Sequence, residues 1–389
     1  MRSIWLLAAS YYFYMSWNPQ YALLMGASTV TTFLTGIMLE RSNTDLKKKL
    51  CVTVSFVINL SILFFFKYFD FALENVNRVL EVLNITIIEK PFDVLLPVGI
   101  SFYTFQALGY TVDVYRGDIS AEKNIIKYSL FVSFFPQLVA GPIERSENLL
   151  IQIRNIETKK LWNQERIRDG LMLMLWGFFQ KLMIADRAAI AVNAVYNQYQ
   201  AFGGGEIFLA TILFAFQIYC DFDAYTNIAR GAAKICGFDL MANFRQPYFA
   251  TSIADFWRRW HISLSSWLRD YVYIPLGGNR VSRARWIFNI LVVWMLTGLW
   301  HGAAWNFVAW GLLFALFLMA EKYLPLQKLP EVLRHGYVVL VVVISFVIFN
   351  AQSLAQAWSD IGGMFGAGGI PLATTESVYY LKSYGLLLI

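Results

Sequence analysis

The stretch WIFNILVVWMLTGLWHGAAWNFVAWGLLFALFLMA (286–320) decides the class of this protein. It contains no Asp, Glu, Lys or Arg, and its polar residues are few. A helix needs ~20 consecutive apolar residues to cross ~30 Å of hydrocarbon. The stretch therefore predicts membrane helices over 286–299 and 303–320.

The composition of the whole chain agrees with this prediction. Of 389 residues, 58% are apolar and only 15% are charged, whereas a soluble domain carries about 25% charged residues. Such a chain cannot cover itself with polar side chains, so its solvent is lipid, and a soluble enzyme, a disordered protein and a disulfide scaffold are excluded. The net charge of +6 comes from short basic clusters between apolar runs, as the positive-inside rule describes. No long basic stripe exists to bind nucleic acid.

Apolar runs recur along the chain. The candidate spans are 4–17, 21–39, 50–66, 94–112, 127–142, 170–185, 206–222, 286–299, 303–320 and 337–349, with a last apolar stretch at 378–389. Their length favours helices over a β-barrel. The expected fold is an all-α polytopic membrane protein, with roughly ten membrane-embedded helices and added interfacial helices, in one multipass domain over 1–389.

The segment SIADFWRRWHISLSSWLRDY (252–271) predicts one amphipathic helix. Ser252 followed by Asp255 fits the pattern of a helix start. At helical spacing one face gathers Ile253, Phe256, Trp257, Trp260, Leu264, Trp267, Leu268 and Tyr271. The arginines lie elsewhere, as expected of a helix in the membrane interface. His261 falls on the border between the two faces, and a plain interfacial brace is the alternative.

His301 is the one ionisable side chain in the stretch 286–320. Burying such a group in a membrane is costly, so it is a functional-site hypothesis, with a neutral histidine bonded between helices as the alternative. Asp221 and Asp223 end another apolar run and are also functional-site candidates, with an interfacial helix end as the alternative. The third histidine, His335, is expected in a polar loop.

The small number of histidines limits the chemistry. Three histidines without an HExxH, CxxC or carboxylate-rich motif predict no metal site, and no nucleotide-hydrolysis loop is present. Two histidines, one as general base and one as polar positioner, suit the transfer of an acyl group from a thioester to a hydroxyl.

Five stretches carry a family resemblance: 95–117, 131–147, 216–222, 243–280 and 296–311. FWRRWHISLSSWLRDYVYIPLGGNR followed by GLWHGAAWNFV is the most specific part. The chain resembles the membrane-bound O-acyltransferases, in particular the bacterial alginate O-acetyltransferase membrane subunits. The resemblance implies a transmembrane tunnel, an essential histidine at His301 and a second active-site histidine at His261. It also implies a cytoplasmic acyl-thioester donor, acetyl-CoA, and no tightly bound cofactor.

The implied acceptor is a hydroxyl of an extracytoplasmic polysaccharide such as alginate, reached directly or through a periplasmic SGNH-type acetyltransferase, in a bacterial inner membrane. D-alanyl or other acyl transfer to a cell-wall polymer, and a transporter of glycan intermediates, are the alternatives. Arg258 and Arg259 are expected to meet the donor phosphates or to anchor the helix. The other residues assigned to donor or acceptor binding, or to the tunnel, are Trp257, Trp300, Asn306, Asp221, Tyr225 and Gln106.

Two departures from the family stand out. The family usually reads Asp-Phe-Ser-Gly-Tyr-Ser-Asp where this chain has Asp221-Phe-Asp-Ala-Tyr-Thr-Asn227, so a carboxylate is replaced at Asn227. The short run 4–17 and the apolar last residues also suggest that both ends are truncated relative to the family.

Overall fold

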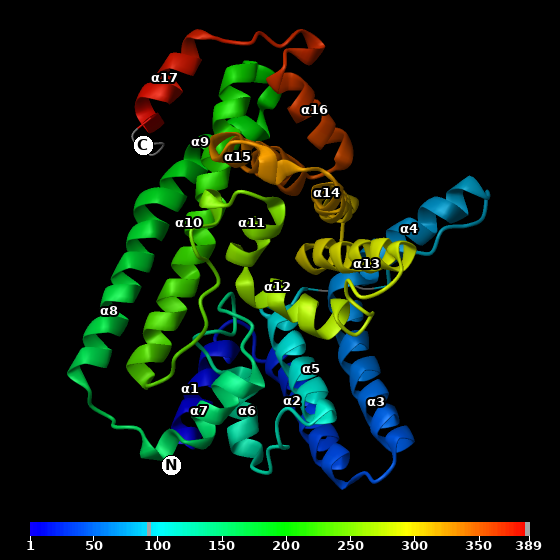
Figure 1. Ribbon diagram of the computed structural model, residues 1–389, viewed down its shortest axis with the longest axis vertical. Helices are drawn as coiled ribbons and strands as arrows, with labels where there is room; N and C mark the ends of the chain where they lie inside the picture. The colour runs from blue at the N-terminus through cyan, green and yellow to red at the C-terminus, as the bar shows by residue number, and fades with distance from the viewer. Residues whose placement is uncertain (92–94, 386–389) are drawn as a thin grey trace. The chain divides into compact units, whose positions relative to one another are not determined.

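The computed structural model describes residues 1–91 and 95–385, and all regular secondary structure in them is helical (Figure 1). The chain forms two compact units. Unit 1 comprises Met1–Leu171 and Ala229–Met241, and unit 2 comprises Met172–Ile228 and Ala242–Ile389. Two helices, α8 (Gln164–Phe179) and α10 (Gly204–Cys236), contribute residues to both units.

Five helices of the described chain are long and apolar enough to cross a membrane. They are α2 (Tyr21–Arg41), the continuous helix Asp45–Val82, α10, α14 (Trp305–Tyr323) and α15 (Glu331–Asn350). They confirm the predicted spans 21–39, 50–66, 206–222, 303–320 and 337–349, and with them a polytopic all-helical membrane protein. The estimate of roughly ten membrane helices is not confirmed.

The remaining apolar runs form helices that are not both long and apolar enough to count among these five. They give α1 (Arg2–Met15), α5 (Ile100–Arg116), α6 (Ile125–Ser133), α8 with the π-helix η4 (Gln180–Ala185), α13 (Arg283–His301) and α17 (Thr375–Tyr384). The prediction of a helix over 127–142 is wrong beyond Ser133, because Pro136 disfavours helical backbone at the residue before it. The ends of two predicted stretches, at 94 and 386–389, lie outside the described residues.

Unit 1 packs α1, α2, α3 (Asp45–Leu63), α5 and α6 around an aromatic core. Tyr128 is fully buried, and its hydroxyl donates to Thr32 Oγ1 at 2.7 Å. The ring of Tyr110 lies 4.5 Å from that of Tyr128, and its hydroxyl accepts the N–H of Glu122. The hydroxyls of Tyr128 and Tyr110 are therefore both paired, which lowers the cost of burying them.

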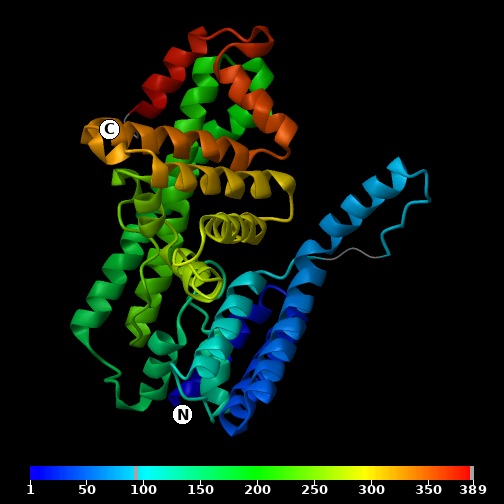
Figure 2. The same ribbon diagram turned by 45° about the vertical axis from the view of Figure 1, so that its right-hand side comes forward.

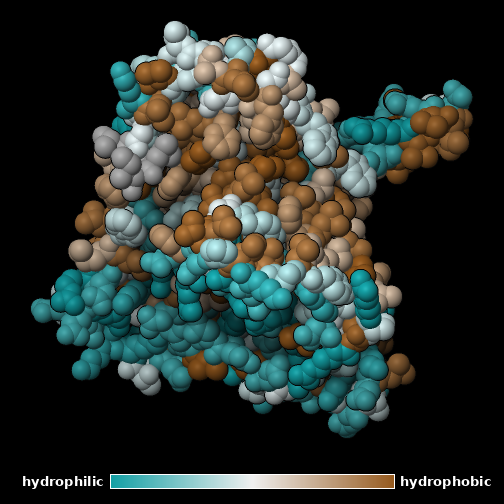
Figure 3. Space-filling model, turned by 45° about the horizontal axis from the view of Figure 1, so that its top comes forward, coloured by the Kyte–Doolittle hydropathy of each residue, from teal (hydrophilic) through white to brown (hydrophobic). Residues whose placement is uncertain are grey.

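Helix α4 (Phe69–Val82) extends away from α2, α3 and α5 within unit 1 (Figures 1 and 2). It follows α3 through the π-helix η1 (Phe64–Tyr68). Figure 3 shows hydrophilic side chains along one side of this projecting helix and hydrophobic ones along the other. Its exposed valines, Val76, Val79 and Val82, suit the boundary between lipid and water.

In unit 2, α13 and α14 form an antiparallel pair whose backbones approach very closely. A Cβ atom added at Gly298 would lie 2.2 Å from the carbonyl oxygen of Phe307, and one at Gly311 would lie 2.2 Å from that of Trp294. Small residues allow membrane helices this approach. The turn Gly302–Ala304 therefore joins two helices whose crossing is fixed by glycine.

Shorter elements complete the fold. They are α7 (Ile151–Arg154), α9 (Asp186–Asn197), α11 (Ile253–Arg259), α12 (Ile262–Leu268) and α16 (Leu354–Met364). His335, predicted in a polar loop, instead lies in the second turn of α15.

Replacing Gly298 with Ala tests the helix crossing. The added methyl group meets backbone of the facing helix, which cannot rotate away, so we expect a loss of about 1–3 kcal/mol in stability. Thermal unfolding of the purified protein in detergent measures it. Gly336→Ala is the matched control, because a Cβ there meets nothing within 4 Å. Equal unfolding temperatures of Gly298→Ala and Gly336→Ala would contradict the close approach.

Candidate active site

The segment 252–271 is not one helix. Ser252 begins α11 as predicted, its side chain accepting the N–H of Asp255 at 3.0 Å. The helix ends at Arg259, and α12 begins only at Ile262. Between them His261 adopts the left-handed conformation, with φ +44° and ψ +54°. The prediction of a continuous helix is therefore wrong at His261, although seven of the eight predicted apolar-face residues are buried, all except Tyr271.

Asn243 holds this break in place. Its backbone carbonyl accepts the N–H of Ile262 at 2.9 Å, and its side-chain oxygen accepts that of Ser263 at 3.2 Å. Asn243 is fully buried, and its amide donates to Thr226 Oγ1. It therefore caps α12 from outside the helix, and this compensates a residue in a conformation that costs about 1–3 kcal/mol.

The break turns the His261 side chain into the interior. Only 1% of His261 is exposed, and its ring lies 4.7 Å from the ring of Phe222 and 5.3 Å from that of Trp300. Neither ring nitrogen has a hydrogen-bond partner among the residues that the structure describes. Burial, and next the neighbouring His301, lower the pKa of His261 well below its ordinary value. His261 is therefore neutral in the folded protein and lies deeper than its border position in a helical projection predicted.

His301 is the last residue of α13 and is partly exposed. Its Nδ1 lies 2.7 Å from the carbonyl oxygen of Thr297, one turn earlier. A carbonyl only accepts, so Nδ1 carries the proton. In the neutral ring, Nε2 is then the unprotonated nitrogen, the one able to accept a proton.

The two histidines lie together. Their ring centroids are 6.2 Å apart, and Trp300 contacts both rings, at 5.3 Å from His261 and 5.0 Å from His301. Two aromatic residues that the sequence analysis did not single out complete the surroundings of His301: Trp310 at 4.9 Å and Phe349 at 5.5 Å. Thr297 also went unnoticed, although its position four residues before His301 on a helix could have indicated it.

The neighbouring residues Arg258 and Arg259 have different surroundings. Arg259 forms an ion pair with Asp255 at 3.0 Å. Arg258 is exposed and lines two cavities of unit 2, of about 830 and 400 Å³. Arg258 is therefore the better placed of the two for an anionic ligand.

The other predicted site residues in unit 2 have varied surroundings. Trp257 is buried against Trp294 at 4.7 Å and lines the smaller cavity. The amide of Asn306 donates to the carbonyl of Ala351 at 2.8 Å, fixing the start of α14 to the end of α15. Asp221 forms an ion pair with Lys181 at 2.6 Å.

The last two predicted site residues are Tyr225 and Gln106. Tyr225 is 37% exposed on α10. Gln106 belongs to unit 1, where its amide donates to the Phe131 carbonyl and accepts from Gln137, both at 2.7 Å. The amide of Gln106 is thus used inside unit 1.

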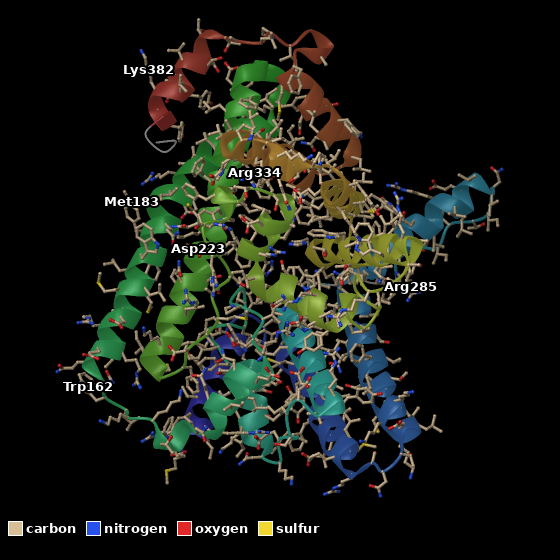
Figure 4. The ribbon with its side chains drawn as sticks, viewed as in Figure 1. Trp162, Met183, Asp223, Arg285, Arg334 and Lys382 are labelled. Carbon is tan, nitrogen blue, oxygen red and sulfur yellow. The ribbon has the colours of Figure 1, made fainter. Side chains whose placement is uncertain are left out.

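Asp223 lies one helical turn before Asn227 on α10. Asp223 on α10 (Figure 4) accepts from the amides of Gln180, at 3.0 Å, and Asn227, at 3.1 Å. Asn227 also donates to the Gln180 oxygen at 3.1 Å. The substitution at 227 therefore accompanies a carboxylate at 223, so that one acidic group remains on this face.

Comparison with known proteins identifies the family of this chain. Residues 119–356 match the profile of MBOAT, the membrane-bound O-acyltransferase family. The chain belongs to this family. A probable alginate O-acetylase of Pseudomonas aeruginosa is 37% identical over 94% of this chain and 70% of the relative. A peptidoglycan O-acetyltransferase of Helicobacter pylori is 32% identical over 95% and 75%. A teichoic acid D-alanyltransferase of Bacillus subtilis is 27% identical over 67% and 70%.

Family membership confirms the resemblance drawn from the sequence motifs. The protein is an O-acyltransferase and a multipass membrane protein.

The buried His261 predicts how stability depends on pH. Because its pKa is lowered in the folded state, the unfolded chain takes up a proton first as pH falls below about 6.5. Stability contributed by neutral His261 is complete above pH 6.5 and falls by up to about 1.4 kcal/mol per pH unit below it. His261→Asn, which tolerates the same backbone conformation, removes this slope.

The measurement is the unfolding temperature of wild type and His261→Asn between pH 7.5 and 5.5. Burial raises the pKa of Glu144 to about 7 and that of Asp360 to about 6, so both proteins share those titrations and only the difference between them reports His261. Parallel pH profiles would contradict the buried neutral ring.

Exchanging the side chains at positions 223 and 227 tests the hydrogen bonds among Asp223, Asn227 and Gln180. Asn227→Asp brings a second carboxylate within hydrogen-bond distance of Asp223, and we expect it to lower both stability and activity. Asp223→Asn with Asn227→Asp keeps one carboxylate and one amide at these two positions and should recover most of both. If the double variant is worse than Asn227→Asp alone, the two positions do not share one carboxylate.

Proposed function

We propose that this protein is an O-acetyltransferase that moves acetyl groups from acetyl-CoA to hydroxyls of an extracytoplasmic polysaccharide. The observation that carries the proposal is the pair of adjacent histidines, of which His301 is oriented by Thr297 with Nδ1 protonated. Two relatives are O-acetylases by name, and they match 94% or more of the chain. These matches favour acetyl over D-alanyl, since the D-alanyltransferase matches less of the chain at lower identity.

In the proposed reaction His301 is the general base. The acceptor hydroxyl attacks the thioester carbonyl carbon while its proton passes to Nε2 of His301. The carbon–sulfur bond then breaks, the new ester forms, and the departing thiolate takes the proton from His301. The hydrogen bond from Nδ1 to the Thr297 carbonyl stabilises the positive charge that the ring acquires between these two steps.

His261 is proposed as the positioner. Its ring is neutral and contacts Trp300, which also contacts His301. A neutral imidazole supplies one donor and one acceptor for a bound thioester or hydroxyl without repelling the imidazolium formed on His301.

The acceptor is proposed to be alginate or another exported polysaccharide, reached directly or through a serine of a periplasmic SGNH-type transferase, in a bacterial inner membrane with a tunnel joining the two sides. The names of the alginate and peptidoglycan relatives support a polysaccharide acceptor. Membership of an acyltransferase family favours this function over transport of intact glycan intermediates.

His301→Ala should abolish acetyl transfer, because it removes the ring whose Nε2 is proposed to take the hydroxyl proton. The measurement is transfer of labelled acetyl from acetyl-CoA to polymer in washed membranes, with the amount of membrane-inserted protein determined in parallel. His335→Ala is the control, since that ring contacts Phe249 and not the two active-site histidines. Near-normal transfer by His301→Ala would refute its role as base.

His261→Gln should retain measurable activity with the same loss at acid pH as wild type, because the amide still donates and accepts a hydrogen bond. His301→Gln should be inactive. The pH profile of acetyl transfer for both variants decides between the roles. Activity in His301→Gln together with inactivity in His261→Gln would reverse them.

A further inference from the structure

Helix α16 (Leu354–Met364) carries an acid in the middle of its buried face. Ala357, Asp360 and Met364 recur at the three- and four-residue spacing of one helical face, and all three are buried. Trp358, on another face, is 70% exposed. The helix packs against α14 and α15, which belong to the same unit. Periodicity therefore predicts an apolar residue at position 360, where the chain has a carboxyl group that is 0% exposed.

Neither oxygen of the Asp360 carboxyl group has a hydrogen-bond partner among the residues that the structure describes. Tyr196 of α9 is near enough for the charge of Asp360 to raise the pKa of its hydroxyl, in addition to the larger effect of burial. Thr211 Oγ1 donates its one hydrogen to the Ile207 carbonyl at 2.8 Å, so the Tyr196 hydroxyl donates to Thr211 Oγ1 at 2.6 Å. Both hydroxyl hydrogens are therefore used, and neither is available to an ionised Asp360.

The segments beside α16 bring few titratable groups toward Asp360. They are Tyr196 of α9, Tyr199 of the short helix η5 (Tyr199–Ala201) and Glu206 at the start of α10. Glu206 accepts hydrogen bonds from the hydroxyls of Thr374 and Ser377. None of these three groups is a cation, so none stabilises an ionised Asp360.

The other titratable groups on the neighbouring helices lie toward the opposite ends of those helices. Measured along each helix axis, they are about 13 Å or more from Tyr196, Asn306 and Ala351, the residues of α9, α14 and the end of α15 on the side of α16. They are Asp186 and Arg187 on α9, Glu321, Lys322 and Tyr323 on α14, and Glu331, Arg334, His335 and Tyr337 on α15. The short helix η9 (Ala367–Gly369), which also packs against α16, has no titratable side chain.

An unpaired carboxyl group can be buried at low cost only in its neutral form. Burial raises the pKa of Asp360 to about 6, whereas an exposed Asp titrates near ~3.9. The packed helix therefore holds this proton more firmly than a released one. The contribution to packing is complete below about pH 4 and is lost as pH rises through about 6.

Helix α16 is connected directly to the surroundings of His301. The Phe349 ring, near the end of α15, lies 5.5 Å from the His301 ring. The carbonyl of Ala351 accepts the amide of Asn306 at 2.8 Å, and Ser353 begins α16 two residues later. A movement of α16 therefore acts on residues that pack beside the histidine.

We propose that α16 is a pH-sensitive helix, which stays packed on α14 and α15 while Asp360 is uncharged. Ionisation of Asp360 releases the helix and loosens the end of α15 beside His301. The device responds to pH whichever acyl group the protein transfers, so it does not rest on the proposed function.

The test is the rate at which a dipyridyl disulfide labels a cysteine placed on α16 of the full chain in detergent. Cys51, Cys220 and Cys236 are first replaced with Ala. Ala357→Cys is buried and reacts only when the helix is released, whereas Trp358→Cys is exposed and reports the intrinsic reactivity of a thiol at each pH. The ratio of the two rates should fall about tenfold from pH 7.5 to pH 5.

Variants at position 360 isolate the carboxyl group. Asp360→Asn should make the ratio independent of pH, and Asp360→Leu, which suits the apolar face, should keep it low at every pH. Glu376→Gln is the matched control, because that carboxylate is exposed on α17 and its loss should leave the tenfold change intact. A ratio that is constant with pH while Asp360 is present, or the same change in Asp360→Asn, overturns the proposal.

A second labelling position tests the link to the site. Ala351→Cys, at the end of α15, is 4% exposed and should show the same dependence on pH and on Asp360 as Ala357→Cys. A labelling rate at position 351 that does not follow the rate at position 357 would overturn the coupling of α16 to the residues beside His301.

Discussion

The close crossing of α13 and α14 is the constraint on which the site depends. Gly298 and Gly311 let the two backbones approach to a distance that any side chain would prevent. On one side of this crossing the helix ends at His301, with Trp310 of α14 against its ring. On the other side the same pair of helices brings Trp286 beside Tyr323. The crossing of α13 and α14 thus positions both the His301 ring and the Trp286–Tyr323 contact.

The helix break at His261 allows an ionisable side chain to be buried. A continuous helix would leave the ring at the border of the apolar face, whereas the left-handed residue turns it among Phe222, Trp300 and His301. Desolvation then keeps the ring neutral. Asn243 makes the break possible by taking the N–H groups that a helix interior would otherwise have paired.

The two ends of α13 in unit 2 have different surroundings, aromatic at one end and cationic at the other. Around the histidines the side chains are aromatic, so the surroundings have a low dielectric constant and strengthen any hydrogen bond made there. At the far end of α13 the cavity of about 830 Å³ is lined by Arg258, Lys322, Lys328 and Arg334.

The sequence by itself determined the membrane class and the family, because these depend on local apolar content and on motif residues. It predicted roughly ten membrane helices, of which five are confirmed. It could not determine that the helix 252–271 breaks at His261, that 134–145 is irregular, or that Lys322, Lys328 and Arg334 line one cavity. Those features arise from contacts between segments far apart in the chain, such as Asn243 with Ser263 and Glu321 with Ile253. Hydropathy and periodicity describe one segment at a time, so only the tertiary structure decided them.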